Sequence, residues 1–173
     1  MAVLESRARL LGHPLHPILL VFPLGLLSTS LLYDGLHRLN DDEKAAETAN
    51  ALIASGVVSG LAAAVPGVID WLAIPEGTRA KMVGQVHGLG NVVVLGLFGA
   101  SWMLRRPAPE RPSNAAIALS AAGGALAMGT AWLGGELIHR LGVSIDEGAD
   151  LNAPNSLVAH PDAPSITTDP SKS

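Results

Sequence analysis

Four long stretches of this chain contain no charged side chain, and apolar residues dominate each of them. They span residues 10–33, 48–69, 82–104 and 112–135, so each is at least 22 residues long. About 20 apolar residues are enough for a helix to cross the hydrocarbon core of a bilayer. One such stretch could be a buried core helix, but four in succession predict a protein with four transmembrane helices.

The polar segments between these stretches set the expected ends of the helices. We predict helices over about 14–36, 45–70, 83–104 and 113–141, which together form an all-α, antiparallel membrane domain over residues 12–141. Residues 1–11 are a short polar lead-in. Residues 142–173 are rich in Asp, Asn, Ser, Thr and Pro, a composition that predicts a disordered or weakly structured tail.

Proline and glycine modify this pattern inside the predicted helices. Pro23 lies within the first helix and Pro66 near the end of the second, where each predicts a kink or a break. Gly56 and Gly60 form a GxxxG motif, which lets another helix approach closely. We favour a contact inside the bundle; the alternative is a contact between two copies, which would make the protein a homo-oligomer.

Composition supports a membrane protein and excludes several functions. Only 15% of residues are charged, against about 25% in soluble domains. The net charge of −4, without a basic stripe, argues against nucleic-acid binding. Cysteine is absent, which excludes disulfides, thiolate catalysis and Cys-ligated metal centres. No nucleophile arrangement or phosphate-binding loop is visible, so we do not predict an enzyme.

The expected location is the inner (plasma) membrane, crossed several times, with the lipid bilayer as the main partner. Lys and Arg residues near the membrane number five on each side, so the positive-inside rule does not decide the orientation. Arg7 and Arg9 precede a first helix without a clear cleavage site. This arrangement favours cytoplasmic termini.

Ionisable residues gather at one face of the predicted bundle. Antiparallel helices place alternate ends on the same side, so the following residues share the side of the N-terminus: His13, His16, Asp70, His87, Glu136 and His139. Asn91 lies one turn deeper than His87, and Trp132, one turn before Glu136, is expected to line the same site. Ionisable groups inside a membrane are costly and are usually paired or functional. His37 and His160 are expected to be solvated.

Several functions are compatible with this set of residues. His16 and His87 lie deepest, and two imidazoles from different helices can ligate one haem iron. A non-haem metal held by histidine and carboxylate ligands is a second possibility. A proton or quinone site is a third. The competing interpretation is a structural or interaction protein without a cofactor, in which these side chains cap helices and support packing.

Four motifs resemble a known family. They are Gly12-His13-Pro14-Leu15-His16-Pro17 (followed by Phe22-Pro23-Leu24-Gly25), Gly67-Val68-Ile69-Asp70-Trp71, His87-Gly88-Leu89-Gly90-Asn91 and Trp132-Leu133-Gly134-Gly135-Glu136-Leu137. Their order resembles the bacterial membrane family called domain of unknown function 2231. The resemblance covers about residues 10–145. In the family's pattern a Tyr and a His follow the Gly-Gly motif, whereas here the histidine, His139, comes two positions earlier.

The resemblance implies a small four-helix membrane protein of a family without a settled function, whose members are sometimes associated with Rieske-type iron–sulfur proteins. It also implies a distant similarity to b-type membrane cytochromes, which favours haem b as the cofactor. We therefore expect an electron-transfer subunit with His16 and His87 as axial ligands. The residues expected around the cofactor are His13, Asp70, Asn91, Glu136 and His139. A redox protein or a quinone would be the electron partner.

Overall fold

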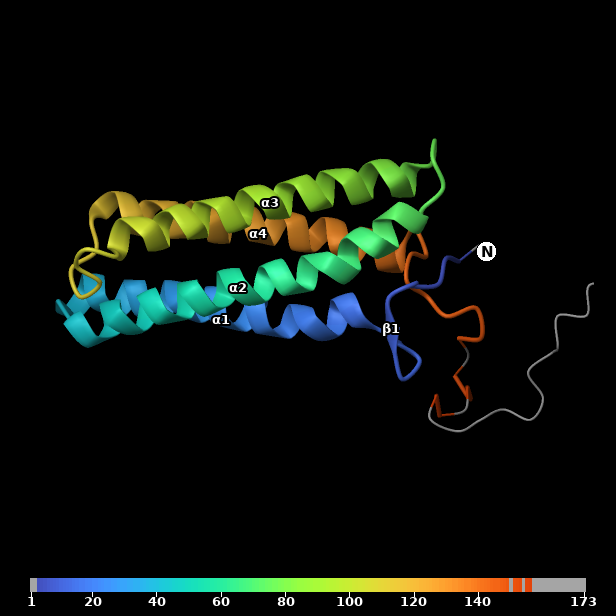
Figure 1. Cartoon of the computed structure of the whole chain (residues 1–173), viewed down its shortest axis with the longest axis horizontal. Coiled ribbons are helices and arrows are strands. Elements are labelled where there is room, and N and C mark those ends of the chain that lie inside the picture. The colour runs from blue at the N-terminus through green and yellow to red at the C-terminus, as the bar shows by residue number, and fades with distance from the viewer. Residues whose placement is uncertain (1–2, 150, 154, 157–173) are drawn as a thin grey trace, which may run out of the picture.

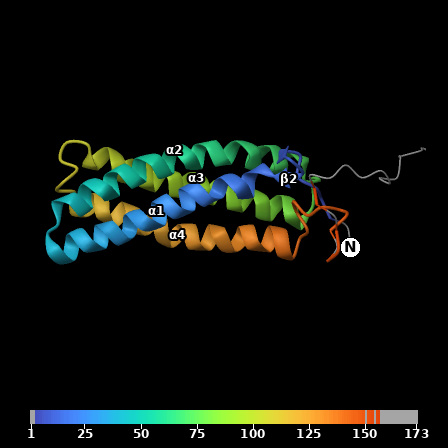
Figure 2. The same cartoon turned by 90° about the horizontal axis from the view of Figure 1, so that it is seen from below.

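Four antiparallel α-helices make up the protein in a computed structural model, which describes residues 3–149, 151–153 and 155–156 (Figure 1). They are α1 (Leu15–Asn40), α2 (Glu43–Ala73), α3 (Arg79–Arg105) and α4 (Asn114–His139). The helices run side by side in two perpendicular views (Figures 1 and 2). The predicted antiparallel four-helix bundle is therefore confirmed.

Capping residues explain where the helices begin and end. The Asp42 side chain accepts hydrogen bonds from two backbone N–H groups of α2, and Thr78 and Ser113 cap α3 and α4 in the same way. Asp41 adopts a left-handed conformation (φ 53°) and ends α1, which extends four residues beyond its predicted end. Pro66 does not break α2, which continues to Ala73.

The four helices form two hairpins that meet at a small apolar core. The contacts of α1 with α2 and of α3 with α4 are extensive, those between α2 and α3 are fewer, and those between α1 and α4 are fewer still. Leu27, Ile53, Val94 and Phe98 form the core of the bundle. A Cβ atom added at Gly56 would lie 2.5 Å from a carbon of Leu27 on α1. Gly56 therefore serves the contact between the two helices of the first hairpin.

Gly60 serves the contact between the two hairpins. A Cβ atom added there would lie 2.6 Å from a Leu95 carbon of α3, and both glycines are buried. The favoured contact inside the bundle is confirmed. The alternative, a homo-oligomer formed through Gly56 and Gly60, is wrong for these residues because their surface is already covered by the chain itself.

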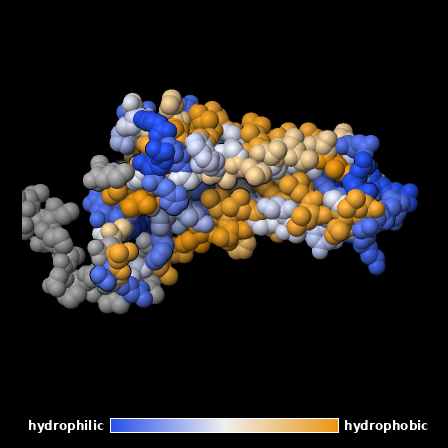
Figure 3. All heavy atoms as spheres, turned by 180° about the vertical axis from the view of Figure 1, so that it is seen from behind, coloured by the Kyte–Doolittle hydropathy of each residue, from blue (hydrophilic) through white to orange (hydrophobic). Residues whose placement is uncertain are grey.

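The outer surface of the bundle is apolar over its middle and polar at its ends (Figure 3). All four helices are long and apolar enough to span a membrane. Large apolar side chains that point outward include Val21, Leu32, Val58, Val92 and Met128. Such a belt needs lipid around it, because it would be unfavourable in water. The chain is therefore an integral membrane protein that crosses the bilayer several times.

The N-terminal segment is ordered, although its sequence showed only a polar lead-in. β1 (Arg9–Leu10) and β2 (His13–Pro14) form an antiparallel pair that leads into α1. Leu4 pairs with Val143, which is buried, so residues just after α4 pack against the N-terminus. We predicted that these residues after α4 begin a disordered tail, but they belong to an ordered cap. The cap lies at the end of the bundle where the described chain begins. Residues 157–173, including His160, lie outside the described residues.

Candidate functional site

The ionisable residues predicted for one face do lie at one end of the bundle, the end that carries the N-terminus (Figure 1). They do not form one cluster. Only His16 and His87 approach each other, together with Asn91. Within the described residues, no group of three or more histidines and carboxylates lies close enough to hold a metal ion.

His16 is the second residue of α1 and is fixed against α2. Its Nδ1 atom lies 2.7 Å from the carbonyl oxygen of Ala63. A Cβ atom at Gly67, one turn further along α2, would lie 2.9 Å from the imidazole ring. Glycine at position 67 therefore provides the space in which the His16 ring lies. The GVIDW motif thus has a packing function that its sequence does not indicate.

His87 has an equivalent environment in the other hairpin. Its Nδ1 atom lies 2.8 Å from the carbonyl oxygen of Thr130 on α4. A Cβ atom at Gly134 would come within 3.2 Å of the ring. The Nδ2 atom of Asn91, one turn deeper on α3, lies 3.1 Å from His87 Nε2. Each histidine therefore belongs to one helix and contacts a carbonyl and a glycine of the neighbouring helix in the same hairpin.

These contacts determine which ring nitrogens are protonated. A carbonyl oxygen only accepts hydrogen bonds, so Nδ1 must carry the hydrogen in both rings. Neutral imidazole then has its lone pair on Nε2. The Asn91 amide donates to Nε2 of His87, which agrees with this tautomer. In this tautomer Nε2, the nitrogen that a metal ion would use, is the acceptor of each ring, and in His87 it is occupied by the Asn91 amide.

The two rings face each other across the interface between hairpins. Their centroids are 6.5 Å apart and their planes are nearly perpendicular, at 89°. Both rings are half-buried. Because one ring comes from each hairpin, the pair lies where the bundle is joined least extensively. The arrangement can hold a group between two imidazoles.

Asp70 anchors the N-terminal cap and does not contact the histidine pair. Its carboxylate accepts hydrogen bonds from Ser6 Oγ (2.8 Å) and from the backbone N–H groups of Arg7 (2.8 Å) and Ala8 (3.2 Å). Ala8 in turn accepts a hydrogen bond from the backbone of Leu15, the residue before His16. Asp70 is therefore connected to His16 through the cap.

Two ion pairs of Arg9 also help to hold the cap. Arg9 contacts Asp146 at 2.5 Å and Glu5 at 2.7 Å. The backbone N–H of Gly148 and the guanidinium of Arg9 lower the pKa of the Asp146 carboxyl from its ordinary value. Asp146 is half-exposed, so we assign this pair a local role in holding the cap closed.

The remaining predicted residues point elsewhere. Glu136 is buried and pairs with Arg79 at 2.7 Å. His13 and His139 are exposed, and His13 Nδ1 lies 3.2 Å from the carbonyl of Leu11. Trp132 is 67% exposed, so the expectation that it lines the site is wrong. Its side chain instead points outward.

Sequence reasoning missed a buried charged cluster at the opposite end of the bundle. Arg105 of α3 forms two hydrogen bonds of 2.7 Å with the Asp34 carboxylate of α1, and its side chain is fully buried. Ser101 and Ser120 complete the cluster. The sequence signal was present: Asp34 and Arg105 have opposite charges at helix ends on the same side. His37, expected to be solvated, is also buried there, 9% exposed.

Comparison with known proteins identifies one family. A family model described as "Predicted membrane protein (DUF2231)" matches residues 12–147. No curated protein and no solved structure matches the chain. The matched region contains all four helices and the paired histidines.

Proposed function

This chain belongs to the family of predicted membrane proteins called domain of unknown function 2231, and we propose that it is a haem-binding electron-transfer subunit with His16 and His87 as axial ligands. One observation carries the proposal: two half-buried imidazoles from different hairpins lie next to each other, and each has its Nδ1 atom at a backbone carbonyl. Histidines that bind a metal through one ring nitrogen usually donate a hydrogen bond from the other nitrogen to a carbonyl or carboxylate oxygen.

The separation of the rings supports coordination of a single ion. Metal–imidazole bonds of about 2.0–2.1 Å, together with about 1.1 Å from Nε2 to the ring centre, place two opposed ring centroids about 6.3 Å apart. The separation of the His16 and His87 centroids is 6.5 Å. The observed separation of the two rings is thus close to the one that a shared ion requires.

The surrounding residues fit such a group with one local change. The Asn91 amide occupies the lone pair of His87 Nε2, so it must rotate away before that nitrogen can bind iron. Gly67 and Gly134 hold the two rings in place because a larger side chain would displace them. The two histidines would hold the group between the hairpins, whose contacts with each other are fewer than those within each hairpin. When bound, haem supplies reversible transfer of one electron.

The charged residues at this end act on the site indirectly in our proposal. Asp70 is a positioning residue, because it fixes the segment that leads into His16. Glu136 is neutralised by Arg79 and holds the start of α3 against the end of α4. Since the pair lies near the end of the bundle with the N-terminus, electrons would be exchanged with a redox protein or quinone at that face, in the inner (plasma) membrane.

A visible spectrum tests the proposal. The protein is expressed with ample haem, purified in detergent and recorded in its oxidised and reduced states. We expect a Soret band, and we expect its loss in His16→Ala and in His87→Ala. His139→Ala is the matched control, because His139 lies at the same end but is exposed. Far-UV circular dichroism of each variant shows whether the helices are intact.

Three outcomes would overturn the proposal. A colourless and metal-free preparation would support the competing interpretation, a structural membrane protein in which the two histidines only join helices. A colourless preparation that contains a stoichiometric metal would instead support a non-haem site. Retention of haem in both ligand variants, with intact helices, would show that it binds elsewhere.

A further inference from the structure

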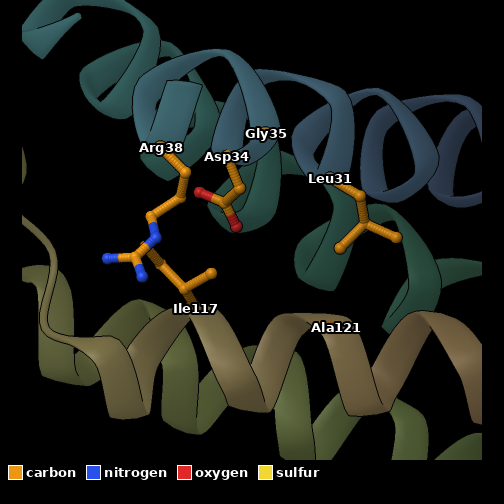
Figure 4. Close-up of a pocket in the computed structure, with 6 residues that line it drawn as sticks. All are labelled: Leu31, Asp34, Gly35, Arg38, Ile117 and Ala121. Atoms are coloured by element: carbon orange, nitrogen blue, oxygen red, sulfur yellow. The ribbon is translucent and has the colours of Figure 1, made fainter. Parts of the chain in front are cut away.

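A slot opens between α1 and α4 at the end of the bundle opposite the histidine pair (Figure 4). Its volume is about 320 Å³. The residues that line it are Leu31, Asp34, Gly35 and Arg38 of α1 and Ile117 and Ala121 of α4. The slot exists because these two neighbouring helices make few contacts with each other, and because residues 35 and 121 are small.

The slot runs from the membrane interface into the apolar layer. Arg38 lies two residues before the end of α1, at its mouth, and Leu31 lies seven residues deeper. At 1.5 Å per helical residue this is a depth of about 10 Å. The walls below the mouth are apolar, apart from the Asp34 carboxylate. A molecule that fits this slot has a polar end and an apolar chain.

Of the two charged residues that line the slot, Asp34 is paired with a cation within the described residues and Arg38 is not paired with an anion there. Asp34 is neutralised by the two hydrogen bonds from Arg105 and also accepts one from Ser120 at 2.8 Å. Arg38 is exposed and forms no ion pair within the described part of the chain; its hydrogen bond goes to Oδ1 of Asn114, the first residue of α4, at 2.7 Å. The guanidinium therefore lies at the positive end of a helix, where an anion is favoured.

We propose that this slot binds an anionic phospholipid from the bilayer. The phosphate contacts Arg38 at the mouth, and the first part of an acyl chain lies along Gly35, Ile117 and Leu31. Basic pockets between membrane helices bind anionic lipid headgroups in this way. The apolar depth of the slot distinguishes a lipid from free phosphate, which would use only the mouth. The proposal is independent of the histidine pair.

Native mass spectrometry of the delipidated protein in detergent tests this proposal. We expect more phosphatidylglycerol than phosphatidylcholine of the same chain length to be retained. Arg38→Gln should weaken phosphatidylglycerol retention about fivefold, because one cation near a lipid headgroup contributes about 1 kcal/mol. Gly35→Leu should reduce retention of both lipids, since a side chain there meets open space and fills the slot.

Arg106→Gln is the matched control. Arg106 lies at the same end, is exposed, and stacks on Trp102 at 5.2 Å, away from the slot. The Arg106→Gln variant should retain the wild-type preference for phosphatidylglycerol over phosphatidylcholine. Equal effects of Arg38→Gln and Arg106→Gln would overturn the proposal, and so would unchanged lipid retention in Gly35→Leu. Competition by inorganic phosphate alone, without any need for an acyl chain, would also contradict it.

Discussion

The buried pair of Asp34 and Arg105 gives the sharpest stability prediction. Arg105 is fully buried and Asp34 is 3% exposed, and the pair joins α1 to α3 at one end of the bundle. Asp34→Asn preserves the shape of the side chain but removes its charge. The variant also places an amide NH2 donor where a carboxylate oxygen accepts from the guanidinium. The substitution therefore leaves a buried cation without its counterion.

The size of the effect follows from the contacts. Arg105 donates two hydrogen bonds to Asp34, one to Ser101 and one to Ser120. Hydrogen bonds to charged groups contribute about 1.5–3 kcal/mol each, and Asp34→Asn removes one of them outright. Loss of one partner of a buried ion pair costs about 3–5 kcal/mol in total. We expect the free energy of unfolding to fall by about 3–5 kcal/mol.

Reversible unfolding by SDS in mixed micelles, followed by circular dichroism, measures this change. The double variant Asp34→Leu/Arg105→Met removes both charges and should lose less than half as much as Asp34→Asn. Arg111→Gln is the control, because its ion pair with Glu43 is exposed and contributes at most about 1 kcal/mol. A loss below about 1 kcal/mol for Asp34→Asn, or a double variant less stable than the single one, would refute the reasoning.

Three further predictions concern the rest of the bundle. Asn91→Ala should tighten metal or haem binding, because it frees His87 Nε2; unchanged affinity in a titration would count against that ligand. Gly56→Val should lower the free energy of unfolding by about 1–3 kcal/mol, because the added side chain overpacks the contact with α1. Unfolding in mixed micelles measures this change. A stable variant with an altered oligomeric state would contradict the contact inside the bundle. The lowered pKa of Asp146 stabilises the cap above the carboxyl's unfolded pKa of about 3.9, and this contribution is lost as the pH falls through the folded value. Hydrogen-exchange protection of the amides of residues 4 and 144 should therefore decrease at acid pH, and Asp146→Asn should weaken that dependence; an identical pH profile in the variant would exclude Asp146 as the cause.

The length of the four charge-free stretches was sufficient to predict the helices and their location in a membrane. The depth of each residue in the bundle also followed, because successive antiparallel helices run in opposite directions. This placed His16, His87 and Glu136 at one end, as the structure has them. Depth does not give the rotation of a helix about its own axis. Glu136 therefore faces Arg79, and Trp132 faces outward, although both were expected beside the histidines.

The helix ends account for most of the other differences. The predicted third helix ends at residue 104, which leaves Arg105 in the following loop. In the structure Arg105 is the last residue of α3 and is buried. His37 was likewise assigned to a loop, but α1 continues to Asn40. The N-terminal cap had no periodic pattern to reveal it. Its order depends on Asp70, more than 60 residues away in the sequence, and on residues after α4.

The most direct test of the central claim is the electron paramagnetic resonance spectrum of the oxidised protein loaded with haem. Two axial imidazoles give low-spin ferric iron, and nearly perpendicular ring planes give a strongly anisotropic signal. The angle of 89° between the His16 and His87 rings therefore predicts a highly anisotropic low-spin spectrum. A high-spin spectrum, or a low-spin spectrum unchanged in His16→Ala and His87→Ala, would contradict the assignment of these two residues as ligands.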